Sequence, residues 1–222
     1  MGAPENKAFL RRVPLLSSLS EAQIDLLAAG SVRRNYPRGR TIVAEGEPSQ
    51  SLYILLSGRA KVQRSDSEGK EVILAILGAG EFFGEMSLID DAPRSASVIT
   101  IEASDFMAIN KDSFKSMMMQ STEVCLAVMK GLVKRLREAD KKIETLALLD
   151  VYGRVARTLL DMAEEIDGTK IIRHKVSRQD MAKVVGASRE MVSRVMKDLE
   201  ERGVIETQEN ASVIIKERLT ND

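Results

Sequence analysis

A glutamate and an arginine in the segment GEFFGEMSLIDDAPRSASV, which starts at Gly80, could together bind a sugar phosphate. Gly84 and Glu85 lead into a predicted short helical turn, and Arg94 and Ser95 follow the loop DDAP. A glycine lets the backbone approach an anion, and free N–H groups at a helix start bind phosphate oxygens. Arg94 would add a charge-assisted contact, and the Glu85 carboxylate would accept a hydrogen bond from a ribose hydroxyl. The alternative is an ordinary surface ion pair between Glu85 and Arg94.

A second group of residues, in VSRQDMAKVVGASREMVSRVMKDLEERG from Val176, could bind nucleic acid. Ser177 followed by Asp180 resembles a capping box and predicts a helix over 178–185, which Gly186 ends. Ser188 is the predicted N-cap of a second helix that runs to about residue 202. The buried side of this helix is predicted to be Met191, Val192, Val195, Met196 and Leu199. Its N-terminal end leaves four side chains available, namely Arg189, Glu190, Ser193 and Arg194.

Arginine can donate to guanine, and glutamate can accept from cytosine, when the first turns of such a helix enter the major groove. The chain has no net charge, so any DNA-binding surface must come from local clustering. Between positions 170 and 197 the chain has eight basic residues and only two acidic ones. The basic residues are Lys170, Arg173, Lys175, Arg178, Lys183, Arg189, Arg194 and Lys197, and the acidic ones are Asp180 and Glu190. Phosphate contacts would supply most of the affinity. The alternative is that these charges only solvate a helix pair.

The elements that position the first group of residues are predicted to be short strands. From about Arg33 to Ile109, alternating apolar runs are broken by glycines, which is typical of an antiparallel barrel or jelly roll. The runs are TIVAEGE, SLYILLSG, RAKVQR, EVILAIL, SASVIT and DFMAIN. Before them, the segment from Ser20 predicts a short helix with Ser20 as its N-cap.

A long helix is predicted to follow the strands. Apolar residues recur at steps of three and four at Met129, Leu132, Leu136, Ala139, Ile143 and Leu146. This seam favours a two-stranded coiled coil between two subunits, and packing on the chain's own barrel is the alternative. From Asp150 we expect another helix, a turn at Asp167 and Gly168, a strand at 170–172, the helix pair and a final hairpin. The predicted α+β domains are a barrel (1–110), a dimerisation helix (111–148) and a DNA-binding domain (149–222).

Two long segments resemble known families. FGEMSLIDDAPRSASV resembles the phosphate-binding cassette of cyclic-nucleotide-binding domains. LALLDVYGRVARTLL and GASREMVSRVMKDLEERGVI resemble the winged helix-turn-helix part of the CRP/FNR transcription regulators, so the resemblance covers nearly the whole chain. It implies a ribose–cyclic phosphate site formed by Gly84, Glu85, Arg94 and Ser95, with Met86 and Ser87 lining the turn.

The same resemblance implies a homodimer that binds double-stranded DNA at a palindrome with a TGTGA-like half-site. Arg189, Glu190 and Arg194 would contact bases, with Ser193 as a further candidate, and Ser177 and Arg178 would also bind the DNA. RNA polymerase is a further partner that the family suggests, although the segment from Asp161 to Lys170 is shorter than the polymerase-contacting loop of cAMP-responsive relatives.

The chain departs from the family at the nucleotide base. Two hydroxyl residues of cAMP-responsive members contact adenine, and the alignment places Ala139 and Asp140 there. Alanine makes no side-chain hydrogen bond, and an ionised aspartate accepts without donating. The effector is therefore expected to be cAMP or another cyclic nucleotide, with cyclic di-GMP as the competitor.

Composition argues against several other classes of protein. Cys125 is the only cysteine and His174 the only histidine, so we expect no metal site, no prosthetic group, no catalytic residues and no enzyme. No apolar run reaches the roughly 18 residues that span a membrane, and we expect a cytoplasmic protein with no membrane partner. A cyclic-nucleotide-binding module that acts on a protein partner is the alternative function.

Overall fold

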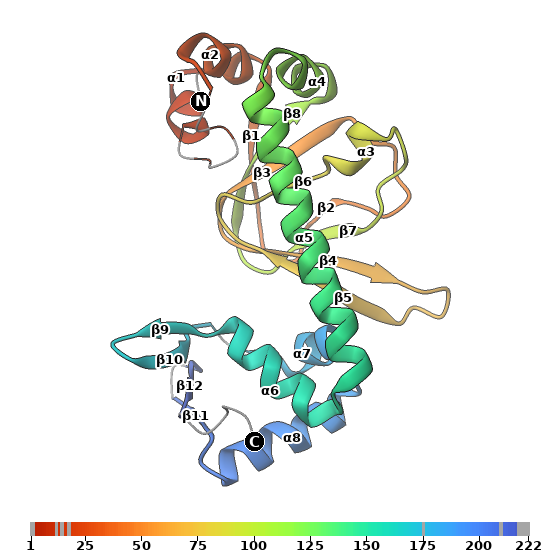
Figure 1. Cartoon of the computed structure of the whole chain (residues 1–222), viewed down its shortest axis with the longest axis vertical. Helices are drawn as coiled ribbons and strands as arrows, with labels where there is room; N and C mark the ends of the chain where they lie inside the picture. Colours follow the sequence, from red (N-terminus) through yellow and green to blue (C-terminus); the bar gives the residue numbers. More distant parts are fainter. Residues whose placement is uncertain are drawn as a thin grey trace. The chain divides into compact units, whose positions relative to one another are not determined.

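The computed structural model describes residues 3–11, 13, 16, 19–174, 176–208 and 211–216 (Figure 1). Lys175, one of the basic residues counted above, lies outside this set. The chain forms two compact units, one ending at Leu136 and the other beginning at Arg137. The predicted domain boundaries at residues 110 and 148 stay a prediction. Among the described helices, none combines the length and apolar character needed to cross a membrane.

The first unit contains two antiparallel sheets of four strands each. One sheet has the strand order β1-β8-β3-β6 and the other β2-β7-β4-β5. All six predicted strands are present, together with β1 and β6. The strands are β1 (Ser31–Tyr36), β2 (Thr41–Val43), β3 (Ser51–Ser57), β4 (Ala60–Ser65), β5 (Glu71–Leu77), β6 (Phe82–Phe83), β7 (Ser97–Thr100) and β8 (Ser104–Asn110). The predicted jelly-roll-like fold is confirmed.

The sheet that contains β3 and β6 is buried on both faces. Because successive strand residues point to opposite faces, neighbouring residues enter different cores. Phe82 packs with the helices of the unit, whereas Phe83 packs with Leu55 and Phe106 between the two sheets. The chain leaves β6 directly into Gly84 and Glu85, so both cores fix the start of the candidate phosphate site.

Helices cover one end of the sheets, where α1 (Ala3–Leu10), α2 (Glu21–Ala29) and α4 (Lys111–Gln120) lie together in Figure 1. The predicted cap of α2 is confirmed, because Ser20 Oγ accepts a hydrogen bond from Gln23 N and Gln23 Oε1 accepts one from Ser20 N.

The single long helix expected after residue 110 is instead two helices. Ser121 has an extended backbone between α4 and α5 (Thr122–Leu148). Its hydroxyl accepts a hydrogen bond from Val124 N at 3.3 Å, as an N-cap does. Serine competes for backbone hydrogen bonds in this way, and apolar periodicity alone does not reveal such a break.

The second unit contains the predicted helix pair and two hairpins. Its elements are α6 (Val151–Met162), β9 (Glu164–Ile166), β10 (Thr169–Ile172), α7 (Arg178–Val185), α8 (Arg189–Glu201), β11 (Ile205–Thr207) and β12 (Val213–Ile215). The strands form one sheet in the order β11-β12-β10-β9. The core of the unit joins Val155 and Leu159 of α6 to Val192, Met196 and Leu199 of α8.

The predicted boundaries of the helix pair are confirmed by their caps. Ser177 Oγ accepts from Asp180 N at 3.2 Å, and Ser188 Oγ accepts from Met191 N at 3.1 Å. Gly186 ends α7 with φ +66°, a left-handed conformation that costs other residues about 1 kcal/mol or more. One prediction is wrong: Met191 is exposed, because it lies on the first turn of α8 beyond the edge of the core.

Candidate ligand site and nucleic-acid interface

Arg94 is held in the first unit by backbone atoms. Its Nη1 donates to the Gly84 carbonyl at 3.1 Å, and its Nη2 donates to the Ser51 carbonyl at 2.6 Å. The backbone of Arg94 also donates to Glu47 O and accepts from Gly46 N. Gly84 has φ +89°, and a Cβ at this position would collide with Arg94 Nη1, so only glycine permits this contact.

The Arg94 guanidinium is a buried cation without an ion-pair partner among the described residues. Its residue is 6% exposed, and no carboxylate among the described residues forms an ion pair with it. Burial lowers the pKa of Arg94, and the negative charges of Glu85 and Glu47 oppose this effect. Because arginine keeps its proton in proteins, a positive charge stays at this position. Such a group can donate to a phosphate.

Glu85 lies beside this arginine but pairs with a different one. Its Oε1 accepts a hydrogen bond from Nη1 of Arg135 on α5, and Nη2 of Arg135 donates to the Phe82 carbonyl. The Arg135 guanidinium lies 4.9 Å from the centre of the Phe82 ring. A surface ion pair between Glu85 and Arg94 is therefore excluded, since Glu85 is 1% exposed and bonded elsewhere.

One oxygen of Glu85 is buried without a hydrogen-bond partner among the described residues. This atom is Oε2. An unsatisfied buried acceptor is costly, and a hydroxyl group of a ligand would satisfy it. Sequence analysis predicted this acceptor role for Glu85 but missed Arg135, because nothing in the helical pattern indicates which arginine of α5 reaches a buried acid.

The other predicted ligand residues differ in their surroundings. Ser87 is buried at the start of the four-residue helix α3 (Met86–Ile89), and its Oγ donates to the Pro93 carbonyl at 3.3 Å, which closes the loop before Arg94. Met86 and Ser95 are exposed. Ala139 and Asp140 are exposed on α5 within the second unit, so their contact with a base stays a prediction.

Removal of the Arg135 side chain is expected to destabilise the first unit. We expect Arg135→Ala to lower the free energy of unfolding by about 2 kcal/mol, because a buried carboxylate loses its partner. Urea denaturation measures this change. Lys134→Ala is the matched control, since Lys134 is exposed and its 3.8 Å ion pair with Glu81 contributes less than about 0.5 kcal/mol. An equal loss in both variants would contradict the buried pair.

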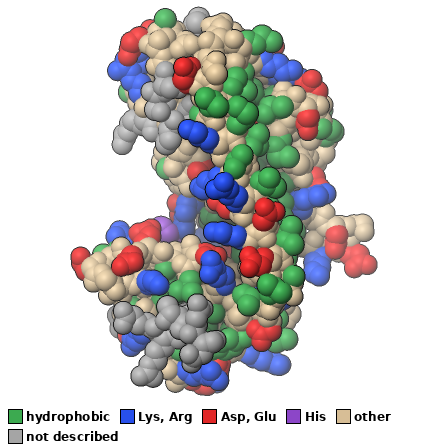
Figure 2. Space-filling view, viewed as in Figure 1, with side chains coloured by type: hydrophobic (Ala, Val, Ile, Leu, Met, Phe, Trp, Pro, Cys, Tyr) green, Lys and Arg blue, Asp and Glu red, His purple; other side chains and the backbone are tan. Residues whose placement is uncertain are grey.

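Apolar side chains of α5 are exposed along the predicted seam. Figure 2 shows hydrophobic side chains along this helix among charged ones. Leu136 is 62% and Ile143 65% exposed, and Met129 and Leu146 are also exposed, whereas Leu132 packs against the core of the first unit. Only the start of the helix, at Val124 and Val128, is fully buried. An exposed apolar seam of this kind is typical of a helix that packs against a partner.

The start of α8 presents polar side chains to solvent. Arg189, Glu190, Ser193 and Arg194 are all exposed, as predicted for a helix that contacts bases. The pKa of Glu190 is lowered by a hydrogen bond from its own backbone N–H and one from the Ser188 side chain, so the carboxylate is ionised and can accept. The Ser193 hydroxyl donates to the Arg189 carbonyl at 2.8 Å, which uses its proton within the helix.

Ser177 and Arg178 have structural contacts of their own at the start of α7. The Ser177 side chain caps the helix. Arg178 Nη2 lies 3.6 Å from Glu200 Oε1 of α8, and the Arg178 side chain is partly exposed. Neither contact prevents the backbone at this helix start from approaching a phosphate.

Comparisons with known proteins match both units. A family model described as a cyclic nucleotide-binding domain matches residues 33–121, and one described as a Crp-like helix-turn-helix domain matches residues 153–219. The first match includes the Gly84–Arg94 loop, and the second includes α7 and α8.

Several regulators resemble most of the chain. The CRP-like cAMP-activated global transcriptional regulator of Mycobacterium tuberculosis is 33% identical over 212 residues, which are 94% of each protein. The cyclic AMP receptor protein of Thermus thermophilus is 36% identical over 86% of this chain and 88% of that protein. The solved structure of the c-di-GMP-responsive global regulator CLP of Xanthomonas campestris has a TM-score of 0.76 and 30% identity, covering 88% of this chain and 99% of that one.

Proposed function

The chain belongs to the CRP/FNR family of ligand-responsive, DNA-binding transcription regulators, and from this premise we propose that its effector is a cyclic nucleotide bound beside Arg94. The observation that supports this most directly is that two buried polar side chains of one loop each lack one partner within the described part of the chain. Arg94 is a buried cation without a carboxylate partner, and Glu85 Oε2 is a buried acceptor without a donor. A cyclic phosphate and a ribose hydroxyl complement them.

We favour cAMP as the effector. Regulators similar to this chain along most of its length are named as cAMP-activated or as cyclic AMP receptor proteins. Gly84, Met86, Ser87 and Ser95 complete the proposed phosphate site. Ala139 and Asp140 remain the candidates for base contact, and because neither offers a hydroxyl, cyclic di-GMP stays the second candidate, as in the name of the similar CLP.

The proposed output is binding of a palindromic, TGTGA-like DNA site by a homodimer. The proposed base contacts come from Arg189, Glu190 and Arg194, with Ser193 as a further candidate, and phosphate contacts come from Ser177 and Arg178. RNA polymerase is a proposed partner at activated promoters. We place the protein in the bacterial cytoplasm, where its DNA would be, and the family consists of transcription regulators and not of enzymes.

Disruption of the α5 seam is expected to separate the dimer. In Leu136→Glu/Ile143→Glu, two exposed apolar side chains become carboxylates that would be buried against a partner helix. We expect the dimer dissociation constant to rise at least about 100-fold, because an unpaired charge is costly to bury. Analytical ultracentrifugation measures it. Lys141→Glu changes an exposed position outside the seam and should remain dimeric. If the double variant dimerises with the wild-type dissociation constant, α5 is not the interface.

Calorimetric titration of the full chain with cAMP, cGMP and cyclic di-GMP tests the proposed effector. We expect cAMP to bind in the micromolar range with one site per chain. Binding of cyclic di-GMP alone would support the second candidate. If none of the three nucleotides binds, the proposed cyclic-nucleotide site is wrong.

A further inference from the structure

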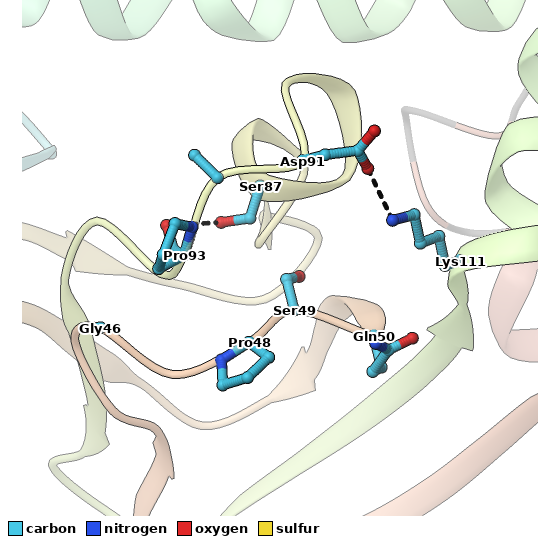
Figure 3. Close-up of a pocket in the computed structure, with 9 residues that line it drawn as sticks. Gly46, Pro48, Ser49, Gln50, Ser87, Asp91, Pro93 and Lys111 are labelled. Carbon is cyan, nitrogen blue, oxygen red and sulfur yellow. Dashed lines mark hydrogen bonds and ion pairs between the residues drawn. The ribbon is translucent and has the colours of Figure 1, made fainter.

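A separate cavity of about 220 Å³ lies beside the Gly84–Arg94 loop (Figure 3). Three segments line this pocket, which is open on one side: the loop between β2 and β3, the Gly84–Arg94 loop, and the first residue of α4. Its lining residues are Gly46, Pro48, Ser49, Gln50, Ser87, Asp91, Ala92, Pro93 and Lys111. Neither Glu85 nor Arg94 lines it, and Ser87 is the one residue that it shares with the proposed nucleotide site.

Ser49 is the unusual residue of this cavity. It is 8% exposed, and its Oγ has no hydrogen-bond partner among the described residues. Figure 3 shows its side chain pointing into the space between the two loops. No hydrogen bond joins it to the Ser87 hydroxyl, which donates to the Pro93 carbonyl. A buried hydroxyl without a partner is uncommon in folded proteins, and an occupant of the cavity would satisfy it.

The charged residues at the cavity favour an anion. Asp91 Oδ1 lies 2.6 Å from Lys111 Nζ and 3.3 Å from Lys115 Nζ. These hydrogen bonds lower the pKa of Asp91, so its carboxylate is ionised and already has two cationic partners. Of these three groups only Asp91 and Lys111 line the pocket, and Lys115 helps to neutralise Asp91 from outside it. An ammonium group has three N–H donors, so Lys111 can donate to a second oxygen while it holds Asp91.

We propose that this cavity binds a small organic carboxylate. The Ser49 hydroxyl and the Lys111 ammonium group donate to the carboxylate oxygens, and Pro48, Ala92 and Pro93 contact a short aliphatic chain. The occupant would touch the residues that immediately precede Arg94. It would thus be a second small-molecule ligand of the unit, independent of whether the first is a cyclic nucleotide.

Saturation-transfer NMR of butyrate with the full-length protein tests this proposal. We expect butyrate to bind with a millimolar dissociation constant and uncharged butanamide to bind about tenfold more weakly, because it lacks the charge-assisted contact. Ser49→Ala and Lys111→Gln are each expected to weaken butyrate binding about tenfold. Lys115→Gln is the matched control, since Lys115 contacts the same Asp91 but does not line the cavity, and it should change binding less than about threefold.

Four results would overturn the proposal. The first two are the absence of a saturation-transfer signal from butyrate, and binding of butanamide as tight as that of butyrate. The other two are wild-type affinity of butyrate for both Ser49→Ala and Lys111→Gln, and displacement of butyrate by cAMP. The last would place butyrate in the nucleotide site. Ser49→Ala should fold normally because it removes a hydroxyl that has no partner, and a thermal melt checks this. Lys111→Gln changes a side chain at the surface and provides the second, independent variant.

Discussion

Arg94→Ala should raise the dissociation constant for the cyclic nucleotide at least about 100-fold, equivalent to ~2.7 kcal/mol of binding free energy. The variant removes the buried cation that would bond the phosphate, and contacts between an arginine and a phosphate are among the strongest hydrogen bonds in proteins. No other described cation beside Gly84 can replace Arg94 in this variant, because Arg135 is bonded to Glu85 and to the Phe82 carbonyl. Calorimetric titration of the variant measures the effect.

Two further variants separate loss of the phosphate contact from loss of structure. Arg94→Ala also frees the carbonyls of Gly84 and Ser51, which could loosen the loop. Arg94→Lys keeps the charge but cannot form both of these bonds in the same planar arrangement, so we expect an intermediate affinity. Arg64→Ala removes an exposed arginine of the same unit and should bind normally. Wild-type affinity in Arg94→Ala would exclude the proposed pocket.

Much of the fold could be predicted because local rules and tertiary packing agree. The strands of the first unit are short apolar runs broken by glycines, and the caps at Ser20, Ser177 and Ser188 each mark a helix start that the structure contains. Gly84, Glu85, Arg94 and Arg194 could be proposed as site residues because their types and spacing lie within long segments that resemble known families.

The features that sequence analysis missed depend on contacts between distant segments. Ser121 interrupts a helical pattern that is otherwise continuous, and only its hydrogen bonds show this. Arg135 lies 50 residues from Glu85 in the chain. The cavity at Ser49 requires three separate segments to meet. Periodicity reports which face of one element is buried, but it does not report which polar groups of two elements meet.

Arg194→Ala is expected to abolish specific DNA binding while the affinity for the nucleotide stays within about twofold of wild type. Arg194 is exposed on the second turn of α8, where a recognition helix contacts base edges. A bidentate contact between arginine and guanine contributes about 1–3 kcal/mol, and a dimer would lose two of them. We therefore expect the dissociation constant for a TGTGA palindrome to rise at least about 100-fold. Fluorescence anisotropy at fixed salt measures it.

The matched control for this prediction is the C-cap residue of the same helix. Arg202 follows the C-terminal end of α8, is exposed and pairs with Asp198, so Arg202→Ala should weaken DNA binding less than about threefold. A scrambled DNA site separates base contacts from phosphate contacts, since a lost phosphate contact weakens both sites equally. If Arg194→Ala lowers affinity for both DNAs alike, Arg194 binds the backbone and the base contacts must come from Arg189 and Glu190. If the palindrome still binds with wild-type affinity, α8 does not enter the groove through its N-terminal turns, and the proposed DNA-binding surface is wrong.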